Sequence, residues 1–303
     1  MKRLIVLFLV LLGGITVLAQ ERQIKTSDGV RLYVKVKGSG MPCLYLHGGP
    51  GAGSFWLEKY FGYYLEQHFQ MVYLDQRGAG RSSSPKNHNY SMDRMAKDFE
   101  EVRKALGIKM WITLGHSFGG VLQMGYIERY PESVSGMIMV NCTLSIEESL
   151  GKSWIIKASE FLGNKDHLSL TDSPDSILAR FKFACKKLKS KNISWKMNYA
   201  SPKTEILVNA TYEEFLKWNN DFNAKAFSIK DYWIDYRKNT SEITIPVLFF
   251  YGQNDWVIGP EHYKGIKFPD MILWGSEVGH MPFLENKPDL KNAIDSFIHK
   301  YRL

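Results

Sequence analysis

The chain has 303 residues, of which 45% are hydrophobic, and a formal net charge of +8. This length and apolar fraction are those of a globular protein, and they favour one large α/β domain with an insertion over two compact domains in tandem. The three cysteines cannot all pair, and Cys43 and Cys142 lie in apolar, strand-like runs, so we interpret them as buried small hydrophobic residues rather than a disulfide framework. No CxxC or His/Cys cluster has the spacing of a metal site. We therefore predict no metal and no cofactor.

The chain begins with a segment typical of a secretory signal peptide. Lys2 and Arg3 precede an apolar run over 4–18, and the small residue Ala19 follows it. The run is shorter than the roughly 20 apolar residues of a spanning helix, and two glycines interrupt it. We expect residues 1–19 to be removed, which leaves a charge of 8 − 2 = +6 and a secreted or periplasmic protein. Retention of this segment as a membrane anchor is the alternative.

Two different hydrophobic patterns follow the N-terminal segment. Residues 24–37 alternate apolar and polar around Ser27-Asp28-Gly29, which predicts an antiparallel hairpin. Short apolar runs then alternate with helix-length segments, as expected for strands buried on both faces of a mainly parallel sheet. Residues 91–106 carry their apolar side chains on one side, which predicts a helix that covers this sheet. The apolar runs are 43–46, 71–74, 111–114, 136–140, 247–251 and 271–274.

A long segment between the strands indicates a lid. Residues 145–241 are rich in Lys, Trp, Tyr and Phe and show helical rather than strand-like periodicity. Since the strand pattern resumes at about residue 245, we predict a helical lid inserted between two parts of one core, 20–144 and 242–303. The basic run 186–191 is interpreted as a solvated helix face rather than a nucleic-acid site, because no nucleic-acid motif accompanies it. We expect the lid tryptophans to pack in its core: Trp154, Trp195, Trp218 and Trp233.

The sequence Gly115-His116-Ser117-Phe118-Gly119 carries the main chemical signal. It follows the apolar run 111–114 and precedes a helical pattern over 121–130, which is the strand-turn-helix context of a GxSxG nucleophile elbow. The two glycines permit a tight turn that lifts Ser117 above the sheet. The amide of Phe118 then lies at the start of a helix, where it can stabilise an oxyanion.

A nucleophilic serine needs a base, and the base needs an orienting carboxylate. Asp255 follows the run 247–251, and His280 follows the run 271–274. Both are expected in loops at the carboxyl ends of strands, and the chain order Ser, Asp, His is that of α/β-hydrolases. We predict Ser117, Asp255 and His280 to form a catalytic triad.

A glycine-rich loop supplies the fourth element. His47-Gly48-Gly49-Pro50-Gly51 comes directly after the run 43–46. Glycine lets the backbone approach a substrate carbonyl, and the amide of Gly49 is our candidate for the second oxyanion donor. Pro50 has no amide proton and cannot serve.

These motifs together resemble the proline iminopeptidase and tricorn-interacting-factor branch of the α/β-hydrolases. The segments that carry the resemblance are HGGPG at 47–51, DQRGAGRS at 75–82, the serine elbow, GQND at 252–255 and GHMPFLE at 279–285. The resemblance implies an eight-stranded, mainly parallel sheet with flanking helices and a lid. It also implies Ser117 as nucleophile, His280 as base, Asp255 as its orienter, and Gly49 and Phe118 as oxyanion donors. Within DQRG, we expect Asp75 and Arg77 to hold loops together rather than to contact substrate.

The resemblance implies an aminopeptidase that acts on short peptides. Members of this branch usually read GGSWG at the elbow, whereas this chain reads GHSFG, a pattern common across esterases and other α/β-hydrolases. Aminopeptidases of this branch also need lid carboxylates to bind the substrate ammonium group, and the candidates here are Glu205, Glu213 and Glu214. A carboxylesterase or amidase acting on a small molecule is the alternative, and a non-catalytic binding protein of the same fold is an alternative of another class.

Overall fold

The computed structural model describes residues 20–163, 173–212, 214 and 218–302. The expected signal peptide, 1–19, lies outside these residues. Within them, one sheet has the strand order β1-β2-β4-β3-β5-β6-β7-β8. Its strands are β1 (Gln20–Lys25), β2 (Arg31–Lys37), β3 (Met41–Leu46), β4 (Phe69–Leu74), β5 (Trp111–Ser117), β6 (Val134–Cys142), β7 (Val247–Gly252) and β8 (Met271–Ser276).

The sheet is mixed, with its antiparallel part at one edge. Strands β1 and β2 form the predicted hairpin, and β2 also runs antiparallel to β4. From β4 to β8 every pairing is parallel. Each predicted apolar run falls within a strand, and the prediction of a mainly parallel sheet is confirmed. The sequences of the central strands are continuous apolar runs because both faces of these strands are buried.

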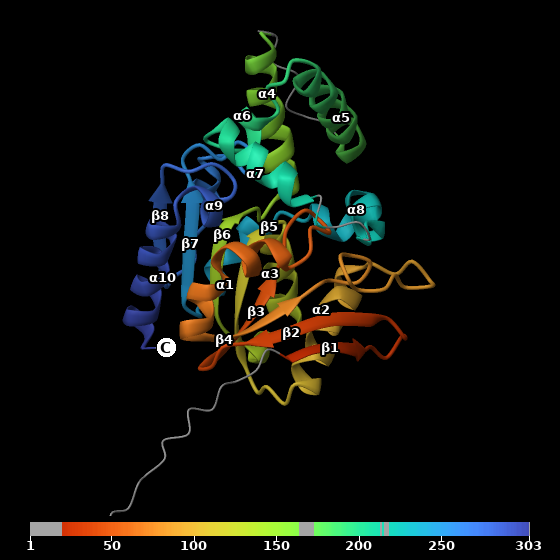
Figure 1. The fold of residues 1–303 in the computed structure, drawn as a ribbon, viewed down its shortest axis with the longest axis vertical. Coiled ribbons are helices and arrows are strands. Elements are labelled where there is room, and N and C mark those ends of the chain that lie inside the picture. The colour runs from red at the N-terminus through yellow and green to blue at the C-terminus, as the bar shows by residue number, and fades with distance from the viewer. Residues whose placement is uncertain (1–19, 164–172, 213, 215–217, 303) are drawn as a thin grey trace, which may run out of the picture.

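Helices cover the two faces of the sheet (Figure 1). In β3, Leu44 and Leu46 face the cluster that contains the helices α2 and α3, whereas Cys43 and Tyr45 face the cluster with α1 and α10. The predicted helix 91–106 is α2, whose first turn is capped by the Ser91 hydroxyl. No helix within the described ranges is both long and apolar enough to cross a bilayer. The helices that pack around the sheet are α1 (Phe55–His68), α2 (Met92–Ala105), α3 (Gly119–Arg129), α9 (Pro282–Glu285) and α10 (Lys287–Tyr301).

The described elements between β6 and β7 are helical and lie beyond the carboxyl ends of the strands (Figure 1). Lys186, Lys187 and Lys189 are exposed on the longest of them, so the basic run lies on a helix face that is open to solvent. Trp154 is buried in the main core cluster, and Trp233 packs against that cluster. The helices are a π-helical segment (Glu147–Trp154), α4 (Ile155–Leu162), α5 (Pro174–Ser190), α6 (Trp195–Asn198), α7 (Pro202–Tyr212), α8 (Asp221–Lys225) and short 3-10 turns up to Glu242.

The three cysteines are free thiols. Cys43 and Cys142 are fully buried in the sheet and act as small hydrophobic residues, as predicted. Burial raises the pKa of all three thiols, to about 11 for the half-buried Cys185. A thiol that stays protonated is a poor nucleophile, so burial disfavours reaction at all three cysteines.

Candidate active site

Ser117 lies at the last position of β5, in a strained turn. Its φ angle is +58°, a left-handed conformation that is uncommon for residues other than glycine. A Cβ atom added at Gly119 would lie 2.1 Å from the carbonyl oxygen of Leu46, and one added at Gly115 would lie 2.1 Å from the Gln123 side chain. The two glycines of the elbow are therefore required by close packing against β3 and α3.

The structure brings the three predicted triad residues together. His280 Nε2 lies 2.9 Å from Ser117 Oγ, and His280 Nδ1 lies 3.0 and 3.1 Å from the two carboxylate oxygens of Asp255. Asp255 is 2% exposed and Ser117 is 6% exposed, so both are shielded from bulk water. When Nδ1 carries its proton toward Asp255, Nε2 has a free lone pair for the serine proton. The arrangement can therefore activate Ser117 as a nucleophile.

The Asp255 carboxylate is held by further donors. Its Oδ1 also accepts hydrogen bonds from the backbone amides of Val257 and Ile258, at 3.0 and 3.2 Å. Asn141 Nδ2 donates to its Oδ2 at 2.8 Å and to the carbonyl oxygen of Gly279 at 2.7 Å. Asn141 is 1% exposed, lies near the end of β6 and has a φ angle of +47°. Asn141 thus ties the loop after β7 to the loop that carries His280, and no sequence motif identified it.

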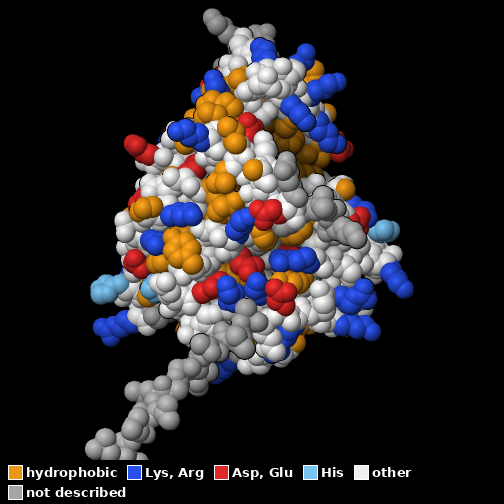
Figure 2. All heavy atoms as spheres, in the orientation of Figure 1, with side chains coloured by type: hydrophobic (Ala, Val, Ile, Leu, Met, Phe, Trp, Pro, Cys, Tyr) orange, Lys and Arg blue, Asp and Glu red, His pale blue; other side chains and the backbone are white. Residues whose placement is uncertain are grey.

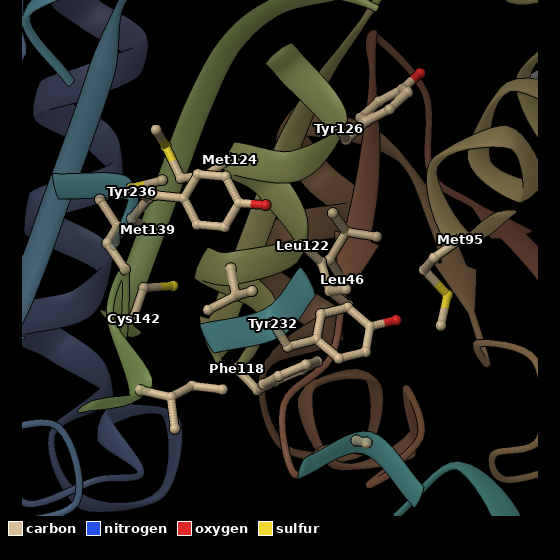
Figure 3. Close-up of a cluster of buried hydrophobic side chains, with 14 of the residues drawn as sticks. Leu46, Met95, Phe118, Leu122, Met124, Tyr126, Met139, Cys142, Tyr232 and Tyr236 are labelled. Carbon is tan, nitrogen blue, oxygen red and sulfur yellow. The ribbon is translucent and has the colours of Figure 1, made fainter. Parts of the chain in front are cut away.

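The two predicted oxyanion donors flank Ser117. The side chain of Phe118 is buried against Tyr232, with ring centroids 5.1 Å apart, and this contact fixes the residue at the start of α3 (Figure 3). Gly49 lines the cavity above Ser117 and has a φ angle of +115°. The neighbouring Gly48 comes closer, because a Cβ atom there would lie 2.6 Å from Ser117 Cβ. The sequence did not predict this close approach of Gly48 to Ser117, although Gly48 lies in the same motif as Gly49.

His116, the residue that departs from the family's elbow, supports the His280 loop. Its Nε2 donates a hydrogen bond to the carbonyl oxygen of His280 at 2.8 Å, and the two rings are 4.8 Å apart. Burial, together with the nearby His280, lowers the pKa of His116 to about 3. His116 is therefore a neutral donor near pH 7.

The lid is hydrogen-bonded to the same loop. The amide of His280 donates to the carbonyl oxygen of Asn198 at 2.8 Å. The Glu285 carboxylate accepts from the amides of Gly279 and Ala200, at 2.5 and 3.0 Å. Burial raises the pKa of Glu285. The segment between α6 and α7 is thus attached to the loop that carries His280.

A cavity of about 660 Å³ lies between Ser117 and the lid. Its walls are mainly apolar, and among its lining residues within the described ranges there is no aspartate or glutamate. One lysine, Lys182 of α5, lines it. The apolar and aromatic part of the lining comprises Tyr45, Ala52, Trp56, Leu150, Trp154, Leu178, Phe181, Tyr199, Ala224, Phe227, Val257, Met281 and Phe283.

The two described candidates for a lid carboxylate, Glu205 and Glu214, do not line this cavity. Glu205 lies on α7 outside it, and Glu214 forms an ion pair with Lys59. Glu213 lies outside the described residues. The structure therefore assigns no described carboxylate to a substrate ammonium group.

Asp75 and Arg77 lie outside the cavity lining, as predicted. Asp75 is fully buried and accepts hydrogen bonds from the amide and hydroxyl of Ser54, at 2.7 and 2.8 Å, and from Arg81. Arg77 is fully buried and pairs with Asp98 and Asp28. Both residues fix loops and helices around the site.

Comparisons with known proteins agree with this architecture. A family model described as alpha/beta hydrolase fold matches residues 42–287. The proline iminopeptidase of Neisseria gonorrhoeae is 36% identical over 120 residues, so the match spans 38% of this chain and 38% of that relative. The proline iminopeptidase of Saccharolobus solfataricus is 28% identical over an alignment of 298 residues, and the match covers 92% of this chain and 92% of that relative. The resemblance to proline iminopeptidases is therefore confirmed.

Solved structures show the same fold. A proline iminopeptidase-related protein from Thermus thermophilus has a TM-score of 0.77 at 20% identity, covering 93% of this chain and 97% of that one. An esterase from Exiguobacterium antarcticum has a TM-score of 0.67 at 22% identity, covering 92% and 100%. At these identities the likeness shows the fold, and the predicted fold class is confirmed.

Proposed function

The chain belongs to the α/β-hydrolase fold family, and from this membership we propose that it is a serine hydrolase that acts through an acyl-enzyme on Ser117. One observation carries the proposal, which is the continuous hydrogen-bonded series from Ser117 Oγ through His280 to the buried Asp255 carboxylate. A serine, a base and an orienting acid in this geometry are the requirements for nucleophilic catalysis.

The reaction follows from the positions of these groups. His280 Nε2 takes the proton of Ser117 Oγ as the oxygen attacks a carbonyl carbon. The amides of Phe118 and Gly49 stabilise the oxyanion that forms, and His280 then passes its proton to the departing alcohol or amine. Water, activated by His280, attacks the acyl-enzyme ester, releases the acid and restores Ser117.

The first substrate proposal is the N-terminal residue of a short peptide, as in an aminopeptidase of the proline iminopeptidase type. It is supported by the Saccharolobus solfataricus relative, whose match extends over 92% of the chain, and by the HGGPG and DQRG motifs. Such an enzyme must bind a free ammonium group next to the scissile bond, which requires an anionic partner.

The second candidate is a carboxylesterase or amidase acting on a small molecule. The specific observation in its favour is that the described cavity lining contains a lysine and no carboxylate. A neutral or anionic acyl compound needs no ammonium site, and the apolar walls suit its carbon chain. The elbow sequence GHSFG agrees with this candidate.

We also propose that residues 1–19 are a signal peptide, which would make the mature enzyme secreted or periplasmic. The basic pair Lys2 and Arg3, the apolar run after it and Ala19 support this proposal. The segment 145–241 is proposed to act as the lid over Ser117, because its α5 and α6 supply residues of the cavity lining.

A fluorophosphonate probe tests the mechanism directly. We expect the probe to label the wild-type protein and not Ser117→Ala, because labelling requires an activated serine oxygen. Ser145→Ala, which alters a buried serine outside the cavity lining, is the control and should be labelled like the wild type. Equal labelling of Ser117→Ala would remove the mechanism, and no labelling of the wild type would favour the non-catalytic binding protein.

A panel of prolyl and alanyl anilides and p-nitrophenyl esters separates the two substrate proposals. Release of the aniline from anilide substrates with a free amino group, abolished in Ser117→Ala, would establish the peptidase. Turnover of esters alone would rule out the peptidase and leave the esterase.

A further inference from the structure

The cavity above Ser117 has a single type of charge in its described wall. Its walls are built mainly from aromatic and aliphatic side chains, and the described lining contains one lysine, Lys182, and no arginine, aspartate or glutamate. His116, which also lines the cavity, is held neutral because burial lowers its pKa to about 3. The electrostatic character of this wall is therefore set by an ammonium group.

Lys182 belongs to a row of cations on α5. Lys186 and Lys189 follow it by four and seven residues, so the three side chains share one side of the helix. Among the described residues, the lid lysines that pair with carboxylates are Lys152, Lys157 and Lys225, and the α5 row takes part in none of these pairs. Figure 2 shows Lys and Arg side chains gathered over α5 beside an apolar hollow.

This charge selects among substrates. A cation at the edge of an apolar wall attracts an anionic group more strongly than it would in open water, because the wall excludes solvent on one side. The same cation repels an ammonium group in the cavity with an interaction energy of similar size. Several like charges on one helix face add to the potential at the Lys182 position.

The position of Lys182 fixes where the anion must lie. Ser117 is at the end of β5 in the sheet, whereas α5 lies in the lid on the other side of the cavity (Figure 1). A substrate that spans the cavity places its reacting carbonyl at Ser117 and its far end toward α5. We propose that the substrate carries a carboxylate at the end remote from the scissile bond and that Lys182 binds this carboxylate.

This inference rests on the proposed hydrolysis at Ser117. The carboxylate can belong to the acyl part, as in a monoester of a dicarboxylic acid, or to the leaving group, as in an ester of a hydroxy acid. Both sources present the same chemistry to Lys182. Two matched pairs of esters distinguish them.

The acyl pair is the p-nitrophenyl monoester of glutaric acid and p-nitrophenyl pentanoate, which have the same number of acyl carbons. The leaving-group pair is the acetate ester of 4-hydroxybenzoic acid and that of its methyl ester. For one of the two pairs, we expect the wild-type kcat/KM to favour the anionic member by about fivefold, the size of a partly exposed charge interaction. The pair that shows the preference identifies the part of the substrate that reaches α5.

Lys182 variants test the assignment. Lys182→Met should bring the two members of that pair to equal kcat/KM, and Lys182→Glu should favour the neutral member. Lys186→Glu, one turn away and outside the cavity lining, is the matched control and should keep most of the preference. A concentrated salt solution should weaken the wild-type preference, because the charges are partly exposed.

The outcomes separate this inference from the proposed function. Equal kcat/KM within both pairs, or a preference that Lys182→Glu leaves unchanged, overturns the role of Lys182 while hydrolysis at Ser117 stands. Absence of hydrolysis of all four esters, together with absence of fluorophosphonate labelling, overturns both. Lys182→Met and Lys182→Glu alter an exposed lid residue, so turnover of the neutral esters reports that each variant is folded.

Discussion

At the scale of single residues, Asn141 is the side chain that joins the two loops carrying Asp255 and His280. Its amide group donates to the Asp255 carboxylate and to the Gly279 carbonyl oxygen. Its backbone adopts a left-handed conformation, which asparagine tolerates better than most residues. In the proposed reaction, Asn141 is therefore a positioning residue, because its contacts orient Asp255 and the loop that carries His280.

Replacement of Asn141 by glycine removes the side-chain amide group, and glycine adopts the same left-handed backbone conformation without strain. A hydrogen bond to a charged group contributes about 1.5–3 kcal/mol, so we expect kcat to fall by about tenfold or more with little change in KM. Steady-state kinetics on a p-nitrophenyl ester measures both constants.

Asn192→Gly is the matched control for this prediction. Asn192 also has a positive φ angle, of 55°, but it is an exposed residue that follows α5. It should leave kcat unchanged. An Asn141→Gly enzyme with wild-type kcat would show that Asp255 and His280 are aligned without Asn141.

The sequence predicted the candidate triad and missed its supports, for a physical reason. Ser117, Asp255 and His280 lie at or after the carboxyl ends of strands in the chain order of α/β-hydrolases, so each is visible as a local motif. Asn141 and Gly48 act through contacts across neighbouring strands, which depend on the register of β6 beside β7 and on the approach of the HGGPG loop to β5. Such contacts have no local signal in the chain.

At the scale of elements, α2 is attached to the loop after β4 by a buried ion network. The guanidinium group of Arg77 binds Asp98 of α2 at 2.5 and 2.7 Å and Asp28 of the hairpin turn at 3.0 and 3.1 Å. Arg94, one turn earlier on α2, donates to Asp98 Oδ1 from its Nη2, at 2.6 Å, and from its Nε, at 3.2 Å. Arg77 binds the same oxygen. The network joins the hairpin, the DQRG loop and the helix that covers the sheet.

Substitution of Asp98 by alanine tests how much this attachment stabilises the fold. Loss of the partner leaves two buried guanidinium groups short of compensating charge, so we expect the free energy of unfolding to fall by about 3–5 kcal/mol. Asp93→Ala, on the same helix, removes an exposed pair with Arg129 and should change it by less than about 1 kcal/mol. Urea unfolding followed by circular dichroism measures both. Similar effects of the two substitutions would mean that the buried network adds no stability beyond that of a surface pair.

Elements were predicted unevenly because their sequence patterns differ in clarity. Strands buried on both faces appear as apolar runs, and α2 has a clear apolar side, so these ranges agree with the structure to within a few residues. No range was assigned to α1, in which tyrosines such as Tyr60 and Tyr63 blur the boundary between apolar and polar sides. The lid was predicted as helical, but its short helices and 3-10 turns left the cavity-facing residues, Lys182 among them, unidentified.

At the scale of the whole molecule, three buried histidines make stability depend on pH. Burial is the main cause that lowers the pKa of His47 to about 4, of His116 to about 3 and of His262 to about 4. An unfolded chain protonates its histidines below pH 6.5, whereas the folded chain keeps these three neutral. Their contribution is therefore fully present above pH 6.5 and is lost as pH falls toward their folded pKa values.

We expect the free energy of unfolding to decrease by about 1.4 kcal/mol per pH unit for each of the three histidines between pH 6 and 4.5. Carboxylates with lowered pKa values, such as Glu100 at about 2, act mainly below this window. Urea unfolding at several pH values measures the slope. His262→Gln should reduce it by about a third, and the exposed His299→Gln should leave it unchanged. A slope that His262→Gln does not alter would contradict the assignment to that histidine.

The hydrogen bonds between the lid and the His280 loop have a mechanical consequence. Asn198 and Ala200 cannot move away from the sheet without breaking their bonds to His280 and Glu285. A displacement of this segment would therefore pull on the backbone of His280, whose imidazole lies beside Ser117. Opening of the cavity on this side and alignment of the proposed base would then be coupled through these hydrogen bonds.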